Sequence, residues 1–273
     1  MDALKFRGIA LLALLVTALL AVPLQAADNY SDLMNKAGMQ RMLSQRITKA
    51  YLYHGQGISK QEAHHQLMTG LKKFEYNHVA LKKVQDAAIQ ELLVSVDTSF
   101  AKLKGLIEQP YKKENAALVM ELSETLLGFC QDVVVKLEEL SGAKIDNIIN
   151  LSGRQRMLSQ RISKYYIAYQ SGFQDENSVQ QLETAVSEFN AALDVLLKEK
   201  RNTERINLLL TKMKKLWKIV EPYFLKVRNK GNPLLVLSTT DDLTTLADEV
   251  TTLYVEVAAS KKDVGKPGNA SIQ

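Results

Sequence analysis

The sequence contains few cysteine, proline and aromatic residues. One cysteine, Cys130, excludes an internal disulfide framework and any zinc or iron–sulfur site built from several cysteines. Five prolines in 273 residues and an aromatic content of 7% disfavour a β-sandwich or barrel and favour helices. The formal net charge of +5 is small for this length, so we expect no nucleic-acid partner. The apolar stretch that ends at Cys130 predicts a buried thiol.

Long hydrophobic runs are scarce, and the clearest one lies at the N-terminus. Lys5 and Arg7 precede an apolar run over 9–22, which at roughly 14 residues is shorter than the ~20 needed to span a membrane. Small residues follow, and the pattern predicts a signal peptide over residues 1–26 that is cleaved after Ala26. An uncleaved anchor is the alternative. We therefore expect a soluble exported protein, which in a bacterium is periplasmic.

A repeated motif is the most informative feature of the chain. The segment Asn35–Lys49 and the segment Asn150–Lys164 agree at eleven of fifteen positions, at a constant offset of 115 residues. Chance does not produce this agreement, and matched residues continue at the same offset beyond the motif. The pattern predicts two tandem copies of one module. We place them at residues 28–142 and 143–260, and we expect a disordered tail at residues 261–273.

Each module is predicted to contain four helices, because apolar residues recur at helical spacing and glycine or proline interrupts the pattern. The predicted ranges are 32–54, 60–84, 87–108 and 115–140, followed by 145–171, 177–200, 203–220 and 237–260. The predicted fold class is all-α, with two tandem up-down antiparallel four-helix bundles. A tight turn at 141–143 would place the modules side by side with parallel first helices. A continuous helix through this point would stack them end to end.

The repeated motif has two distinct faces on a helical wheel. Met39, Leu43 and Ile47 share the side that packs into the core of their own module. The opposite side carries Gly38, Arg41, Gln45 and Thr48 in module 1, and Gly153, Arg156, Gln160 and Ser163 in module 2. A solvated face gives no reason to keep glycine, arginine and glutamine in two otherwise diverged copies. We therefore expect these faces to have a function.

The composition of this face favours an anion site. Gly38 and Gly153 permit a close approach of another helix, and Arg41 and Arg156 offer planar donor pairs that match an oxyanion. If the two first helices face each other, a bound anion relieves the repulsion between the arginines. Further hydrogen bonds are expected from four neighbouring side chains, Ser44, Gln45, Ser159 and Gln160. Arg46 and Arg161 are expected instead to bind carboxylates between helices.

The motif resembles the first-helix signature of NarX-type nitrate and nitrite sensors in its Asn-Lys-Ala-Gly start and its two spaced arginines. The extended run Gln-Arg-Met-Leu-Ser-Gln-Arg is more similar to the PilJ-type domain, the N-terminal sensory module of type IV pilus methyl-accepting chemotaxis transducers. The resemblance implies a periplasmic four-helix sensor domain. It also implies an anion between two first helices, with Arg41, Arg156, Gly38 and Gly153 in contact with it.

The sequence therefore predicts a sensory or binding protein for a small oxyanion such as nitrate or nitrite. The expected partner is a membrane-bound receptor or sensor kinase, because the signalling domains of the resembled sensors have no counterpart in this chain. The alternative is an interaction module without a small ligand, which docks onto a pilus chemotaxis receptor or forms a homodimer.

Other patterns in the sequence carry little weight. No catalytic motif occurs, so we expect no enzyme activity and no cofactor. The pairs Glu62/His65 and Glu75/His78 each lie on one helix, so we expect exposed histidines and no metal site. The lysines around Trp217 predict a solvated helix face.

Overall fold

The computed structural model describes residues 24–141, 147–229 and 231–264. These residues form helices and no β-strand, which confirms the predicted all-α class. Eight helices follow one another in the order α2 (Leu24–Gly55), α3 (Lys60–Leu81), α4 (Ala87–Ile107), α5 (Lys113–Ser141), α6 (Asn147–Gln170), α7 (Glu176–Leu197), α8 (Glu204–Leu225) and α9 (Pro233–Val264).

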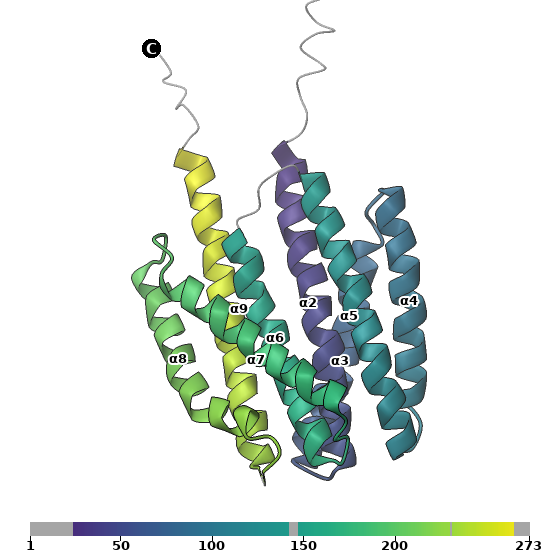
Figure 1. Cartoon of the computed structure of the whole chain (residues 1–273). Coiled ribbons are helices and arrows are strands. Elements are labelled where there is room, and N and C mark those ends of the chain that lie inside the picture. The colour runs from purple at the N-terminus through teal and green to yellow at the C-terminus, as the bar shows by residue number, and fades with distance from the viewer. Residues whose placement is uncertain (1–23, 142–146, 230, 265–273) are drawn as a thin grey trace, which may run out of the picture.

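The helices fall into two groups of four that follow the sequence repeat. In the first group α2 packs on α3 and α5, and α4 packs on α5. In the second group α6 packs on α7 and α9, and α8 packs on both α7 and α9. Successive helices run in opposite directions in both groups (Figure 1). The two tandem antiparallel bundles predicted from the sequence are therefore present.

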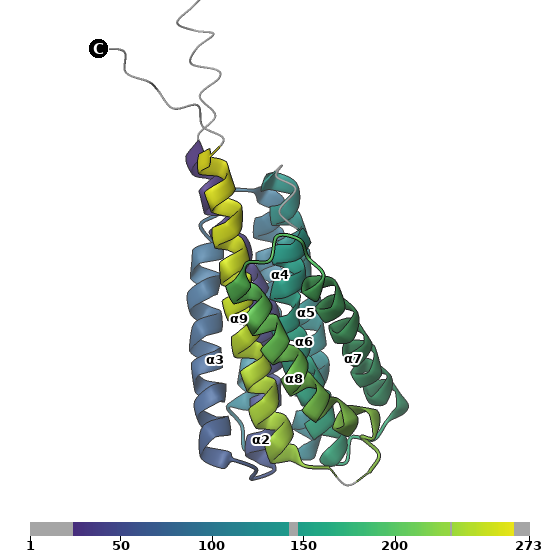
Figure 2. The same ribbon diagram turned by 90° about the vertical axis from the view of Figure 1, so that its left-hand side faces the viewer.

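The two modules lie side by side, with α2 of module 1 packed against α6 of module 2. Both helices start at the same end of the molecule and run in parallel (Figures 1 and 2). The structure thus selects the side-by-side arrangement over end-to-end stacking. Residues 142–146, which contain the predicted break at Gly142, lie outside the described residues. The repeated motif consequently occupies the two central helices.

Local signals in the sequence explain several helix ends. Asp86 and Asp175 each accept a hydrogen bond from the backbone N–H three residues later, at 3.0 and 2.8 Å, and so cap α4 and α7. Gly57 and Gly172, which are equivalent in the repeat, adopt positive φ angles of 70° and 90° after α2 and α6. Glycine reaches this conformation at little cost, so both first helices end in the same way.

Equivalent aromatic pairs lie in the two module cores. Phe74 stacks on Phe100 and Phe189 stacks on Trp217, each with ring centroids 4.2 Å apart. The single tryptophan is fully buried, while the lysines beside it on α8 face outward or lie at the core edge. Cys130 is also buried, as predicted, and burial raises the pKa of its thiol.

The predicted boundaries of the last two helices are wrong, each for a local reason. Helix α8 continues through Pro222 to Leu225, because a proline lacks only its own N–H donor and the residues after it can still form helical hydrogen bonds. Helix α9 begins at Pro233, since a proline suits the first helical position and Asn232 caps the helix through the N–H of Leu235 at 3.1 Å. The predicted disordered tail overlaps α9, which extends to Val264; residues 265–273 lie outside the described residues.

The structure also bears on the expectations for His78 and for the signal peptide. His78 is buried, 6% exposed, where an exposed histidine was expected, because it packs beside Phe74 and contacts Asp97 at 2.9 Å. Helix α2 begins at Leu24, within the predicted signal peptide, of which residues 1–23 lie outside the described residues. No helix among the described residues is long and apolar enough to cross a membrane.

Candidate functional site

The face of the repeated motif that points away from each module core is buried between the modules. Gly38, Gly153, Arg41 and Arg156 all belong to this face, and the two arginines are 4% and 3% exposed. We call this contact the seam, meaning the interface of α2 with α6 together with the flanking faces of α5 and α9. The seam brings together the arginines and glycines that the sequence predicted as a site.

Arg41 is held by amide oxygens. Its Nη1 donates to Gln131 on α5 at 2.6 Å, and its Nη2 donates to Asn150 on α6 at 3.2 Å. Its Nε is buried and has no hydrogen-bond partner among the described residues. Asn150 in turn donates to Glu138 at 2.8 Å, so this carboxylate lies one hydrogen bond further from the guanidinium. Arg41 is therefore a buried cation whose direct hydrogen-bond acceptors are neutral.

Arg156 has a different set of partners at the equivalent place. Its Nη1 lies 2.5 Å from Asp248 on α9, which is half-exposed, and 3.2 Å from Asn35 on α2. Its Nη2 also donates to Asn35 at 3.2 Å. Each arginine thus binds the asparagine that opens the repeated motif of the other module. The two halves of the seam differ in the partner from the last helix, which is Gln131 for Arg41 and Asp248 for Arg156.

The two guanidinium groups both lie close to Gly38. The point where a Gly38 side chain would begin lies 3.4 Å from Nη2 of Arg41 and 3.7 Å from Nη2 of Arg156. The guanidinium of Arg156 packs tightly on Gly153, where a side chain would begin 3.2 Å from its Nη2. Burial, and next the charge of Arg156, lower the pKa of Arg41 to about 10. The seam therefore concentrates positive charge that is taken out of water.

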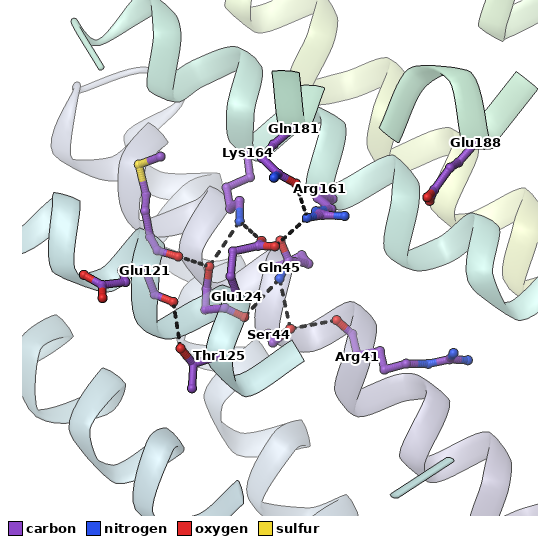
Figure 3. A network of polar contacts seen from close by, with 12 residues as sticks. Arg41, Ser44, Gln45, Glu121, Glu124, Thr125, Arg161, Lys164, Gln181 and Glu188 are labelled. Carbon is purple, nitrogen blue, oxygen red and sulfur yellow. Dashed lines mark hydrogen bonds and ion pairs between the residues drawn. The ribbon is translucent and has the colours of Figure 1, made fainter. Parts of the chain in front are cut away.

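The four other predicted site residues are buried, but their donors are used within the protein. Ser44 donates to the carbonyl of Arg41 at 2.8 Å, and Ser159 donates to that of Gln155 at 2.8 Å. Gln45 donates to Ser44 and to the carbonyl of Ser123, both at 3.2 Å. Figure 3 shows Ser44 and Gln45 in a network from which the guanidinium of Arg41 points away. The structure does not place them beside the arginines' charged ends.

Further along the same two helices from the arginines, two buried lysines bind carboxylates across the module boundary. Lys49 of α2 lies 2.6 Å from Asp241 of α9, and Lys164 of α6 forms an ion pair with Glu124 of α5. The two lysines are equivalent in the repeat and both are fully buried. Each first helix is thus bound to the last helix of the other module, which joins four helices into one central bundle.

Additional groups surround each of these carboxylates. Arg161 donates to Glu124 at 2.5 Å and to Gln181 at 2.7 Å, as Figure 3 shows. Gln66 and Gln160 donate to Asp241 at 2.7 and 3.1 Å. The expectation that Arg161 binds a carboxylate between helices is confirmed. Arg46, at the equivalent place in module 1, lowers the pKa of Asp241 through its charge.

Burial and charge act in opposite directions on these groups. Burial lowers the pKa of Lys164 to about 8, although Glu124 favours the charged ammonium. Burial alone would raise the pKa of Glu124, but Lys164 and Arg161 hold it below its ordinary value. The pKa of Asp241 is lowered in the same way, chiefly by Lys49. The carboxylates are therefore ionised at neutral pH and serve as fixed partners for the lysines.

Sequence reasoning missed the partners of the repeated motif. Lys49 and Lys164 close the motif and could have been found from their identity in both copies. Gln131, Asp248, Glu124 and Asp241 lie on the last helices, where the repeat has diverged. No sequence signal marked them, because their role depends on which helix of the other module they meet. Among the described residues, no group of His, Cys, Asp and Glu is arranged to hold a metal ion.

The fold and the seam define a class of helical tandem module in which one chain pairs two homologous bundles through their first helices. Comparison with protein families identifies the family. The chain matches the type IV pili methyl-accepting chemotaxis transducer N-terminal family, PilJ, over residues 24–128 and again over residues 144–243. The chain belongs to this family and contains two copies of its domain. A search of curated proteins gives no match, and neither does a search of solved structures.

Proposed function

We propose that this chain is an exported sensory protein that binds a small oxyanion in the seam between α2 and α6. Nitrate and nitrite are the first candidates for this ligand. Membership of the chemotaxis transducer family supports a sensory or interaction role. The observation that carries the ligand proposal is Arg41, a buried guanidinium with two neutral acceptors and an unpartnered Nε, next to a second buried arginine.

The energetics favour an anion at this place. Two like charges about 7 Å apart repel by roughly 2 kcal/mol at an effective dielectric of 20. A monoanion beside Arg41 and Arg156 offsets this repulsion, and its charge-assisted contact with Arg41 is stronger than the bonds that Arg41 makes to neutral amides. Gly38 supports the proposal because, without a side chain, it lets the Nη2 atoms of both arginines approach the same point beside its backbone. A planar oxyanion matches the planar donors of arginine.

The remaining predicted site residues have a supporting role in this proposal. Ser44, Ser159, Gln45 and Gln160 donate to acceptors inside the protein. We infer that they set the position of α2 and α6 and that Gly38, Gly153, Arg41 and Arg156 make the anion contacts.

The site lies between two halves that a ligand can draw together. Anion binding would change the spacing of α2 and α6, and therefore of the two bundles. A membrane-bound chemotaxis receptor or sensor kinase in the periplasmic space would detect this change from outside the seam. The predicted signal peptide and the family support this location.

Thermal unfolding in the presence of anions tests the ligand proposal. The chain from Ala27 onward is titrated with nitrate and nitrite, with chloride and sulfate at matched ionic strength as comparisons. A ligand at about 100 times its Kd adds roughly 2.7 kcal/mol and shifts the midpoint by several degrees. We expect a saturable shift with nitrate or nitrite that is lost in the double variant Arg41→Ala/Arg156→Ala.

A matched control on the same helix is Arg154→Ala. Arg154 is exposed and binds Glu188 at 2.9 Å, outside the seam. Its loss removes one positive charge near the site without touching either buried guanidinium, so the anion response is expected to persist. A flat response of the unmodified chain to all four anions would contradict the ligand proposal.

The alternative, an interaction module without a ligand, would have used the same faces for docking. In the structure these faces are covered by the other module of the same chain. A receptor or a second chain would therefore contact other surfaces, and substitutions of Arg41 or Arg156 would alter that contact only through the module arrangement.

A further inference from the structure

The two arginines of the seam have different partners on the last helices, and among the described residues only Arg156 donates from its Nε, to the carbonyl of Gly153 at 3.4 Å. Asn150 and Asn35 occupy matching places beside Arg41 and Arg156. The last helix of each module supplies a further partner, which is the neutral amide of Gln131 in module 1 and the carboxylate of Asp248 in module 2. The seam therefore contains one guanidinium with a direct counter-ion and one without.

We propose that Asp248 is a built-in counter-ion that neutralises Arg156, so that the seam takes up a single monovalent anion at Arg41. This inference rests on the proposed function and specifies the charge and the number of the anions bound. The carboxylate of Asp248 lies 2.5 Å from Nη1 of Arg156 and occupies the position that a second anion would need. It remains half-exposed, so it is held from the rim of the seam.

The charge balance explains why a monovalent anion is the preferred ligand. With Asp248 in place, the two guanidinium groups and this carboxylate carry a net charge of one. Glu138 lies beyond Asn150 and raises the pKa of Arg41 through its charge. This effect is smaller than the lowering of the same pKa by burial and by Arg156. A divalent anion would leave a negative charge in a site that excludes water, which is costly. Asp248 is in this sense the residue that sets ligand charge.

The different partners of Arg41 and Arg156 can be exchanged by substitution to test this proposal. Asp248→Asn removes the counter-ion, Gln131→Glu adds one beside Arg41, and the double variant has both changes and the original net charge. All three proteins and the unmodified chain are titrated with nitrate and with sulfate at matched ionic strength, and the unfolding midpoint is recorded. Far-UV circular dichroism without added anion verifies that each variant is folded.

We expect Asp248→Asn to bind sulfate at least tenfold more tightly than the unmodified chain does. Gln131→Glu is expected to weaken nitrate binding at least tenfold, because the new carboxylate takes the place of the anion. The double variant is expected to recover nitrate binding without a sulfate response, now at Arg156. If Asp248→Asn keeps the original preference between nitrate and sulfate, the inference is overturned.

The outcomes separate this inference from the proposed function. If the unmodified chain responds to no anion, the proposed ligand function fails. Asp248→Asn should still acquire an anion-dependent stabilisation, because it leaves Arg156 without its carboxylate. A gain of this kind supports the counter-ion role by itself, and its absence in a folded variant contradicts it. Should Gln131→Glu fail to fold, the double variant provides the same comparison at unchanged net charge.

Discussion

The ammonium group of Lys49 lies 2.6 Å from the carboxylate of Asp241, although 192 residues separate them in the chain. Lys164 of module 2 forms the corresponding ion pair with Glu124 of module 1. These two contacts join each first helix to the last helix of the other module. A chain with two copies of one domain thereby acquires a single central bundle, and the arginines lie on the same two first helices, N-terminal to the lysines.

The first prediction concerns the stability of this central bundle. Lys49→Met leaves the buried carboxylate of Asp241 without its main counter-ion, so we expect the free energy of unfolding to fall by about 3–5 kcal/mol. Lys49→Met/Asp241→Leu removes both charges and should recover a large part of this loss. Urea unfolding at pH 7 measures both values.

A surface ion pair provides the control for this measurement. Arg205 and Glu249 lie 3.2 Å apart with both side chains exposed, and Arg205→Ala should cost about 0–1 kcal/mol. Equal losses for Lys49→Met and Arg205→Ala would show that the buried pair has no special role in holding the modules together.

The second prediction is a dependence on acid. The pKa of Glu124 is held below its ordinary value of 4.5, so in the folded state this carboxylate keeps its charge to lower pH than in the unfolded chain. Its contribution to stability is therefore complete above pH 4.5 and is lost as the pH falls through the folded pKa. The double variant Glu124→Gln/Lys164→Met should lack this part of the acid sensitivity.

The measurement is the difference in unfolding free energy between the unmodified chain and that double variant from pH 7 to pH 3. We expect a constant difference down to about pH 5 and a steady decrease below it. A difference that stays level across the whole range would refute the assigned role of Glu124.

The third prediction uses the glycines of the first module. Gly70 on α3 faces α2, and an added side chain would begin 2.9 Å from Ile47, so Gly70→Ala should destabilise the protein despite the better helix propensity of alanine. Gly105 and Gly128 have nothing within 4 Å of the same point. Alanine at either place should stabilise the helix by up to about 1 kcal/mol. Thermal unfolding of the three single variants tests the opposite signs, and a stabilised Gly70→Ala would contradict the close packing of α2 and α3.

The fourth prediction concerns cooperativity between the modules. Trp217 is the single tryptophan and lies in the core of module 2, so its fluorescence reports on that module, while far-UV circular dichroism reports on all helices. Because the seam is buried and ion-paired, we expect the two signals to give coincident unfolding transitions. In Lys49→Met/Lys164→Met the transitions should separate. Separate transitions in the unmodified chain would mean that the seam does not couple the modules.

A large part of the fold could be predicted from the sequence because the relevant signals are local. Helical spacing of apolar residues, glycine after the first helix of each module and the constant offset of the repeat are read within short windows. The errors at Pro222 and Pro233 arose where one residue type suits either the inside or the end of a helix. His78 was misplaced because its burial depends on Phe74 and Asp97, which lie on two different helices.

The candidate site, like the fold, was predicted only in part from the sequence. The sequence by itself determined that glycine and arginine share one face of a repeated helix, since that follows from the 3.6-residue turn. Only the tertiary structure decided that this face is buried against its own duplicate, that Lys49 and Lys164 bind the opposite module, and that Asp248 neutralises one arginine of the two. The physical reason is that a helix fixes the neighbours of a residue along the chain. The partner across an interface depends on how two helices are placed together, and no short stretch of sequence records that placement.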